Sequence, residues 1–324
     1  MSAVQGELAI TARGLERRFG DVHAVAGIDL SVRSGELFGL VGPDGAGKST
    51  TISCLAGLLA PTRGEVRILG EDPLSRRSRV REQLGLMPQQ YSLYGDLSIA
   101  ENLQFFGRLF GLSKATFRER SERLLGITRL ARFVERRADA LSGGMYKKLA
   151  LACALLHQPR VLLMDEPTNG VDPVSRRELW ELIYELLGDG MAVLVSTPYM
   201  DEAARCHRVG LLHEGKIIAE GAPSALSDQL EYEVVELRGG EREALHALLS
   251  RSPAVVAASP AGSQLRAVVA PGALGELSRE LAALGASAER VAPSFEDLFL
   301  ARVAAHAGKP TGDQATRAGA EALS

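Results

Sequence analysis

Apolar residues along the chain follow two different spacings, which together indicate a protein built from both strands and helices. Residues 7–13 and 28–33 alternate apolar with polar side chains, as half-buried strands do. Short apolar runs favour strands covered on both faces of a parallel sheet, and they occur at Leu37–Val41, Val161–Met164, Ala192–Val195 and Val209–Leu212. The pattern therefore predicts an α/β fold.

Residues 97–157 carry apolar side chains at the helical spacing of three and four, which predicts a helical subdomain over about 91–157. Five aromatic residues gather near its start, at Tyr91, Tyr94, Phe105, Phe106 and Phe110. We favour the interpretation that they pack the core of the subdomain. A groove for a partner protein is the alternative.

After about residue 226 the predicted elements take the order strand, helix, strand, strand, helix, strand. The strands are expected over 233–237, 254–258, 264–270 and 289–292, and the helices over 241–250 and 272–284. This order is typical of a small ferredoxin-like α+β domain, which we assign to residues 226–303. Residues 304–324 offer little to bury, so we expect a disordered tail.

Composition narrows the class of protein without giving a function. The 324 residues suffice for one large or two ordinary domains, and a net charge of −3 does not suggest a nucleic-acid binder. The three cysteines and six histidines are scattered, so no metal-binding spacing arises and a reducing cytoplasm is expected. We see no signal-peptide pattern and no run of about 18 apolar residues that predicts a membrane span.

The strongest candidate site is the segment Gly42-Pro43-Asp44-Gly45-Ala46-Gly47-Lys48-Ser49-Thr50, between an apolar strand and a helical pattern. Its glycines let consecutive backbone N–H groups turn toward an anion, and the helix N-terminus adds partial positive charge. Lys48 can reach the outer phosphates of a nucleoside triphosphate, and Ser49 can place its hydroxyl on a magnesium ion. The segment predicts a nucleoside-triphosphate site.

Two carboxylates follow the apolar strand 161–164, at the sheet edge where α/β proteins place their ligands. We expect Asp165 to hold magnesium opposite Ser49, and Glu166 to orient or deprotonate a water in line with the γ-phosphate. A weaker signal precedes the helix that begins near residue 143. There Ser142 is a good N-cap, and Gly143 and Gly144 permit close approach to an anion.

Taken in order, these motifs resemble those of ABC-type ATPases over about residues 6–225, and they lie at Gly42–Thr50, Gln89, Leu141–Gly144, Val161–Glu166 and Val171-Asp172. The resemblance implies a P-loop NTPase with a RecA-like mixed sheet and a helical subdomain, within a nucleotide-binding domain over residues 1–225. It also implies that ATP and Mg²⁺ bind, and that Gln89 links the metal to a transmembrane partner. Phe19 becomes the residue that stacks on adenine, although from the residues alone a small core is the better explanation.

The resemblance further implies a homodimer or pseudo-dimer of ATPase subunits, with Asp172 in a loop at the dimer interface. A signature loop, Ser142–Gly144, that belongs to the helical subdomain is in the wrong place to cover its own glycine-rich loop. Two copies arranged head to tail would hold two ATP molecules between them, each covered by the signature loop of the other copy. Hydrolysis would then part the copies by removing shared charge contacts.

Two positions depart from the family pattern. The usual glutamine after Ser-Gly-Gly is Met145, which we expect to alter the signature contacts only modestly. Pro198 stands where the family normally has a histidine that touches the γ-phosphate. His207 lies nine residues further on, about 13 Å away if the segment is helical, and is a poor replacement. We therefore expect slow or differently assisted hydrolysis.

Segments 293–300 and 197–203 resemble the ATPases of ABC-2-type drug exporters. The implied function is a cytoplasmic ATPase, peripheral on the inner face of the membrane, that powers export of a drug-like or lipid-like substrate through separate ABC-2-type permease subunits. The groove from Gln89 to Phe110 would receive those subunits, and no nucleic acid would be involved. Two alternatives remain: an ATPase acting on ribosomes or DNA, and an importer ATPase, which requires a C-terminal barrel.

Overall fold

The computed structural model describes residues 6–75, 77, 79–90, 93–188, 190–228 and 231–307. By its contacts the chain divides into two compact units. The first contains the described residues of 1–40, 45–197 and 214–216, and the second contains those of 41–44, 198–213 and 217–324. Because the two units exchange segments along the chain, the predicted domain boundary at residue 225 stays a prediction.

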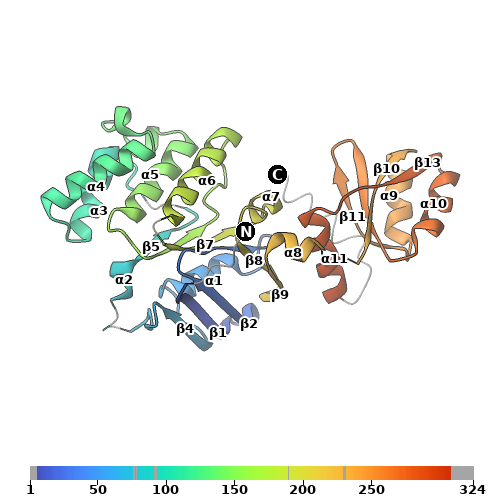
Figure 1. Ribbon diagram of the computed structural model, residues 1–324, viewed down its shortest axis with the longest axis horizontal. Coiled ribbons are helices and arrows are strands. Elements are labelled where there is room, and N and C mark those ends of the chain that lie inside the picture. Colours follow the sequence, from blue (N-terminus) through green and yellow to red (C-terminus); the bar gives the residue numbers. More distant parts are fainter. Residues whose placement is uncertain are drawn as a thin grey trace. The chain divides into compact units, whose positions relative to one another are not determined.

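The strands of the first unit form an antiparallel and a parallel arrangement (Figure 1). The antiparallel sheet has the order β2-β1-β4, with β1 (Leu8–Phe19), β2 (Val22–Arg33) and β4 (Arg63–Ile68). The other has the order β5-β6-β7-β3, with β5 (Leu84–Met87), β6 (Val161–Asp165), β7 (Ala192–Thr197) and β3 (Leu37–Val41). Strand β6 pairs in parallel with β5 and β7. Every residue of β3, β6 and β7 is buried, as their apolar runs predicted.

The helices of this unit are α1 (Lys48–Leu55), α2 (Val80–Gln83), α3 (Ile99–Leu109), α4 (Lys114–Ile127), α5 (Gly143–Leu155) and α6 (Pro173–Leu187). Helix α1 contacts both sheets and so lies between them. The predicted helical region contains α3, α4 and α5, with the short 3-10 helices η1 (Ala131–Phe133) and η2 (Ala138–Ala140) between α4 and α5. Both α3 and α4 pack on α5, so the position of α5 depends on the whole subdomain.

The second unit contains α7 (Met200–Ala203), β8 (Arg208–His213), β9 (Lys216–Gly221) and α8 (Pro223–Asp228). They precede β10 (Glu233–Gly239), α9 (Arg242–Arg251), β11 (Val255–Ala261), β12 (Gln264–Val269), α10 (Leu274–Ala283), β13 (Ala286–Arg290) and α11 (Phe295–Ala307). The sheet order is β11-β12-β10-β13 and every pair is antiparallel. This arrangement confirms the predicted ferredoxin-like fold.

Helices cover both faces of that four-stranded sheet. Helices α9 and α10 pack on one face, where Leu245, Leu249, Leu277 and Leu281 join a buried cluster with strand residues. Helix α11 packs on the other through Ala301 and Leu300 (Figure 1). It also contacts α7 and α8. Within the described residues the C-terminal sheet is open and not a barrel, so the condition for the importer alternative is not met.

Three expectations about element bounds were wrong. Strand β13 begins three residues before the predicted 289–292, because the small Ala286 and Ala288 face the helical layer and carry little strand signal. Residues 304–307, assigned to the disordered tail, belong to α11, where Ala304 is buried. The rest of that tail, 308–324, lies outside the described residues. The first two strands are also longer than the predicted 7–13 and 28–33, because β1 continues to Phe19 and β2 begins at Val22.

Candidate functional site

The glycine-rich segment lies in the predicted context, between β3 and α1. Gly45 and Gly47 have φ angles of +76° and +106°, in the region that favours glycine. Gly47 is the N-cap of α1 and offers no side chain to it, so no side chain caps the first turn. Gly42 and Ala46 are buried, Pro43 and Thr50 are partly exposed, and Asp44 and Ser49 are exposed. A helix start of this kind can receive an anion.

Lys48, the first residue of α1, is almost fully buried, with 4% of its surface exposed. Its Nζ lies 3.1 Å from Oε1 of Glu166, which is equally buried. Burying charge in a protein is costly unless the charge is paired. The two predicted site residues, 118 positions apart in sequence, therefore form an ion pair at the carboxyl end of β6.

Glu166 is held from several directions. Its backbone has a φ of +46°, which is uncommon for a residue with a side chain, and its amide donates to Oγ of Ser196 at 3.0 Å. Its Oε2 accepts from Nε2 of Gln89 at 2.8 Å and from Nδ2 of Asn169 at 3.2 Å. Sparsely populated backbone conformations of this kind concentrate at functional sites. The structure thus joins Lys48, Gln89 and Glu166 in one cluster.

Asp165 ends β6 one residue earlier and is 6% exposed. Its Oδ1 accepts a hydrogen bond of 2.6 Å from the hydroxyl of Ser196, its partner in the register of β6 and β7. Ser196 therefore orients both neighbouring carboxylate residues. Sequence reasoning missed this role, although the carboxyl end of a second buried parallel strand was a usable signal.

Lys147, on α5, is a further residue that sequence reasoning missed. Its Nζ donates to the backbone carbonyl of Gln89 at 2.9 Å. Burial lowers the pKa of this amine, and the negative charges of Glu166 and Asp165 oppose that shift. Since Lys147 belongs to the helix that begins with the signature glycines, it connects that helix to the residue that holds Glu166.

The signature loop lies against α6 rather than against Lys48. The Oγ of Ser142 accepts from the amide of Met145 at 3.4 Å and caps α5. A side chain at Gly144 would meet Cβ of Ser175 at 2.4 Å, so only glycine allows this close approach of α5 to α6. The contacts shown for residues 142–144 are thus with the first turn of α5 and with residues at the start of α6.

Asp172 is the N-cap of α6, and its Oδ1 accepts from the amides of Val174 and Ser175. Hydrogen bonds from Ser175, first through its side chain and then through its amide, lower the pKa of the Asp172 carboxyl. A Cβ at Gly144 would meet Oδ2 of Asp172 at 3.6 Å, so the exposed Asp172 lies beside the signature glycines.

Phe19 is 47% exposed at the end of β1, so the expectation that it packs a small core was wrong. The guanidinium of Arg17 lies over its ring, 4.5 Å from the centroid. An exposed ring with one face held by a cation offers a surface on which a flat heterocycle can stack.

His207 does not continue a helix from the Pro198 segment, because α7 covers only Met200–Ala203. The helical spacing used to place His207 was therefore wrong. The chain still has no histidine at position 198.

The residues predicted to hold Mg²⁺ fit that ion chemically. Ser49, Asp165 and Gln89 offer hydroxyl, carboxylate and amide oxygens, which are the ligands that this hard cation prefers. Among the described residues no group of three or more His, Cys, Asp or Glu could hold a metal ion.

A parallel sheet with a glycine-rich loop, a buried lysine and two carboxylates at the end of a central strand defines a P-loop nucleoside-triphosphate site. Comparison with known proteins supports this assignment of the site. The model of a family described as ABC transporter matches residues 25–169. Together with the relatives described next, this match shows that the chain belongs to the family of ABC transporter ATP-binding proteins.

Two relatives show how far this similarity extends. The probable multidrug ABC transporter ATP-binding protein YbhF of Escherichia coli (strain K12) is 46% identical over 226 residues, 69% of this chain. That match covers only 39% of YbhF. The Nod factor export ATP-binding protein I of Paraburkholderia xenovorans is 44% identical over 242 residues, covering 74% of this chain and 79% of the relative.

Solved structures confirm the fold. An ATP-binding subunit of an ABC transporter matches with a TM-score of 0.63 and 31% identity, covering 68% of this chain and 92% of that structure. The cassette MJ0796, solved as a dimer in a post-hydrolysis state with ADP and Pi, matches with a TM-score of 0.60 and 26% identity, covering 66% and 98%. No helix in the described part of this chain has the length and apolar character needed to cross a membrane.

Proposed function

We propose that the chain binds Mg-ATP, hydrolyses it, and thereby powers export of a drug-like or lipid-like substrate through separate ABC-2-type membrane subunits. The observation that carries the ATPase proposal is the buried cluster in which Lys48 and Gln89 both hold Glu166. Such a cluster places a cation and a general base at one point beside a phosphate-binding loop.

Binding of a triphosphate changes the partner of Lys48. In the structure Oε1 of Glu166 neutralises Lys48. When Lys48 instead binds outer phosphate oxygens, Oε1 loses its partner while Oε2 keeps Gln89 and Asn169. The carboxylate is then oriented and has one oxygen available to accept a proton from an attacking water. Glu166 is thus the proposed catalytic base, and it becomes available only when the nucleotide is bound.

The remaining predicted residues bind the nucleotide. Phe19 stacks on adenine, and residues 42–50 surround the phosphates. Ser49, Asp165 and Gln89 hold Mg²⁺, which neutralises phosphate charge when bound. Ser196 supports this set because it fixes both Asp165 and the Glu166 backbone.

The complete site is proposed to need a second subunit. Ser142–Gly144 and Asp172 lie together near the start of α6, on the surface of one subunit. A head-to-tail dimer would bring the signature loop of each copy to the phosphates held by the other. The dimeric state of MJ0796 with ADP and Pi supports this arrangement.

Helix α3 supplies the proposed contact with the membrane subunits. Its Phe105 and Leu109 are exposed, as is Tyr94 just before it, and the rings of Tyr94 and Phe105 meet edge to face at 4.5 Å. Apolar surface of this kind marks an interaction site. The proposal places the chain on the cytoplasmic face of the membrane. Similarity to YbhF, a probable multidrug transporter protein, and to a Nod factor export protein supports export.

The ATPase proposal is tested by phosphate release and by binding of a fluorescent ATP analogue to purified chain. Lys48→Ala should lose detectable binding and turnover, because the buried ammonium group that binds the phosphates is removed. The matched control is Lys114→Ala, which removes an exposed lysine at the start of α4. Tight Mg-ATP binding by Lys48→Ala, or equal losses in both variants, would contradict the assignment.

The partner proposal is tested separately by co-expression with ABC-2-type membrane proteins and co-purification of the complex. Phe105→Asp should prevent co-purification and leave ATP binding intact. Leu58→Asp changes an apolar residue that is 71% exposed elsewhere on the same unit, and should have no effect. Unchanged co-purification of Phe105→Asp would exclude α3 as the docking surface.

A further inference from the structure

A cavity lies at the amino ends of the parallel strands β6 and β7, opposite the end at which Glu166 lies. Its volume is about 520 Å³. Leu155 at the end of α5, Leu186 near the end of α6 and Met191 just before β7 line it. The catalytic residues follow the carboxyl ends of the strands, whereas this cavity lies where β6 and β7 begin, so the two sites are separate.

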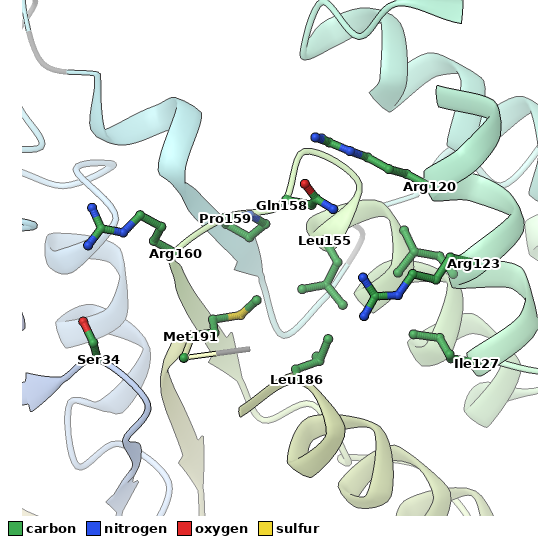
Figure 2. A pocket seen from close by; sticks show the side chains of 12 residues that line it. Ser34, Arg120, Arg123, Ile127, Leu155, Gln158, Pro159, Arg160, Leu186 and Met191 are labelled. Atoms are coloured by element: carbon green, nitrogen blue, oxygen red, sulfur yellow. The ribbon is translucent and has the colours of Figure 1, made fainter. Parts of the chain in front are cut away.

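The cavity combines an apolar floor with a cationic rim. Leu124, Leu155, Leu186 and Met191 are buried side chains of the floor. Arg120, Arg123 and Arg160 also line the cavity, and of the described residues that line it none is acidic. Figure 2 shows Arg120 and Arg123 projecting from α4 on one side, and Arg160 on the other side of the leucines.

We propose that this cavity binds a small anionic amphiphile, with its acid group at the arginines and its apolar chain on the leucine and methionine floor. Cavities of about 300–1,000 Å³ suit small molecules, and a few polar groups on an apolar lining set their orientation. Guanidinium groups match carboxylate and phosphate geometry with paired hydrogen bonds. Arg120 already donates to the carbonyl of Leu156 at 3.2 Å, which positions its guanidinium beside the floor.

Helix α5 connects this cavity to the signature loop. Helix α5 begins at Gly143 and ends at Leu155, a length of about 20 Å. A ligand that touches Leu155 and Met191 would hold the end of α5 against the start of β7. Binding here does not require the chain to hydrolyse ATP, so it is independent of the proposed function.

The test is calorimetric titration of the full chain with decanoate, below its micelle concentration. Decyltrimethylammonium has the same chain with the opposite charge, and inorganic phosphate has the charge without the chain. Decanoate should bind with one molecule per chain, and both comparison compounds should bind at least about tenfold more weakly, the effect expected of a charged hydrogen bond or of the lost apolar contact.

Variants on the two sides of the cavity locate the site. Arg123→Gln should weaken decanoate binding about tenfold, and Arg160→Gln should do the same from the other side. Arg118→Gln, on α4 with a side chain 83% exposed and outside the cavity, is the matched control and should bind normally. Absence of decanoate binding, equal binding of the cationic amphiphile or of phosphate, or equal affinity of all three variants would each overturn the proposal.

Discussion

Glu166 in the first unit and Asp297 in the second are both almost fully buried carboxylates, yet their surroundings differ. Asp297 is 1% exposed, and its two oxygens each lie 3.0 Å from Nε of Arg266. Its Oδ2 also accepts from the amide and the hydroxyl of Ser294, both at 2.7 Å. Each partner lies within the ferredoxin-like module and the helix that covers it.

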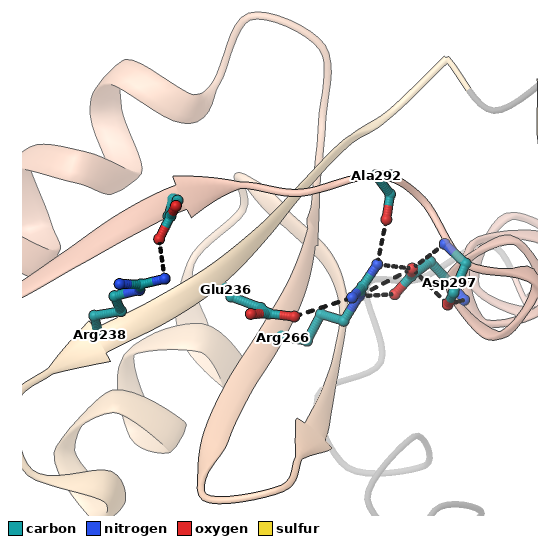
Figure 3. Close-up of polar contacts among 7 residues, drawn as sticks. Glu236, Arg238, Arg266, Ala292 and Asp297 are labelled. Carbon is teal, nitrogen blue, oxygen red and sulfur yellow. Dashed lines mark hydrogen bonds and ion pairs between the residues drawn. The ribbon is translucent and has the colours of Figure 1, made fainter.

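Arg266 completes this second cluster (Figure 3). It also donates to Glu236 at 3.1 Å and to the carbonyl of Ala292 at 2.6 Å. These bonds tie strands β10 and β12 to the start of α11. The cluster is therefore satisfied by the module itself, and its effect is to fix α11 on the sheet.

The cluster around Glu166 is arranged around a position where a ligand can replace a partner. Lys48 stands at the start of α1, where no side chain caps the helix, and Glu166 has an unusual backbone conformation. Two buried carboxylates with similar exposure thus indicate different roles. The identity of the partners of a buried carboxylate, and not its burial, therefore distinguishes a ligand site from a cluster that only stabilises the fold.

Removing the charge of Glu166 should give the largest effect. Glu166→Gln should lower kcat by about 10² to 10⁴, the contribution typical of a general base. The neutral amide of Gln at position 166 does not compete with phosphate for Lys48, so ATP should bind more tightly. Phosphate release and nucleotide titration measure the two quantities. Glu166→Asp is the control that keeps the charge, and normal turnover by Glu166→Gln would remove this residue from its proposed role.

Breaking the Arg266 cluster should affect stability and not nucleotide binding. Arg266→Met leaves buried Asp297 without its cation and should lower the unfolding free energy of the C-terminal module by about 3–5 kcal/mol. Denaturant unfolding measures this loss. The double variant Arg266→Met/Asp297→Leu should recover much of it, since both charges are gone. ATP affinity that fell together with stability would show that the two clusters are not separate in function.

Introducing the missing histidine should have a smaller effect in the opposite direction. Pro198→His adds a donor that can touch the γ-phosphate, and should raise the ATPase rate of the assembled complex about tenfold. Pro198→Ala removes the proline without adding a donor and is the matched control. An unchanged rate for Pro198→His, or an equal gain for Pro198→Ala, would show that the missing histidine does not slow hydrolysis.

Changing the exposed ring of Phe19 should give the smallest effect. Phe19→Ala removes stacking worth about 0.5–1.5 kcal/mol and should raise the Kd for ATP between twofold and about tenfold. Phe19→Trp should retain the wild-type affinity. Isothermal titration compares the three chains, and identical Kd values for Phe19→Ala and the wild type would exclude base stacking at this position.

The buried strands and the ferredoxin-like order were predictable because their signals are local. A continuous apolar run such as Val161–Met164 has one stable place in an α/β sheet, and it was found there. The glycine-rich loop was likewise identified by its position before α1. The first hairpin and β13 were less well predicted, because glycine breaks and small alanines weaken the alternating pattern.

The supporting residues of the site were not predictable by the same means. Ser196 acts through its register with Asp165, and Lys147 through the packing of α5 near Gln89. Neither belongs to a motif that the sequence analysis used, and both depend on contacts between distant segments. Asn169, three residues after Glu166, is nearer in sequence, but its role depends on the turn after β6.

The mass of Glu166→Gln with and without Mg-ATP, measured by light scattering, tests the central claim that one subunit completes the site of another. We predict that ATP doubles the mass from one chain to two, and that a further Ser142→Arg change restores the single-chain mass by obstructing the signature loop. A mass that remains that of one chain at saturating ATP, or a dimer that persists in the double variant, would contradict the account.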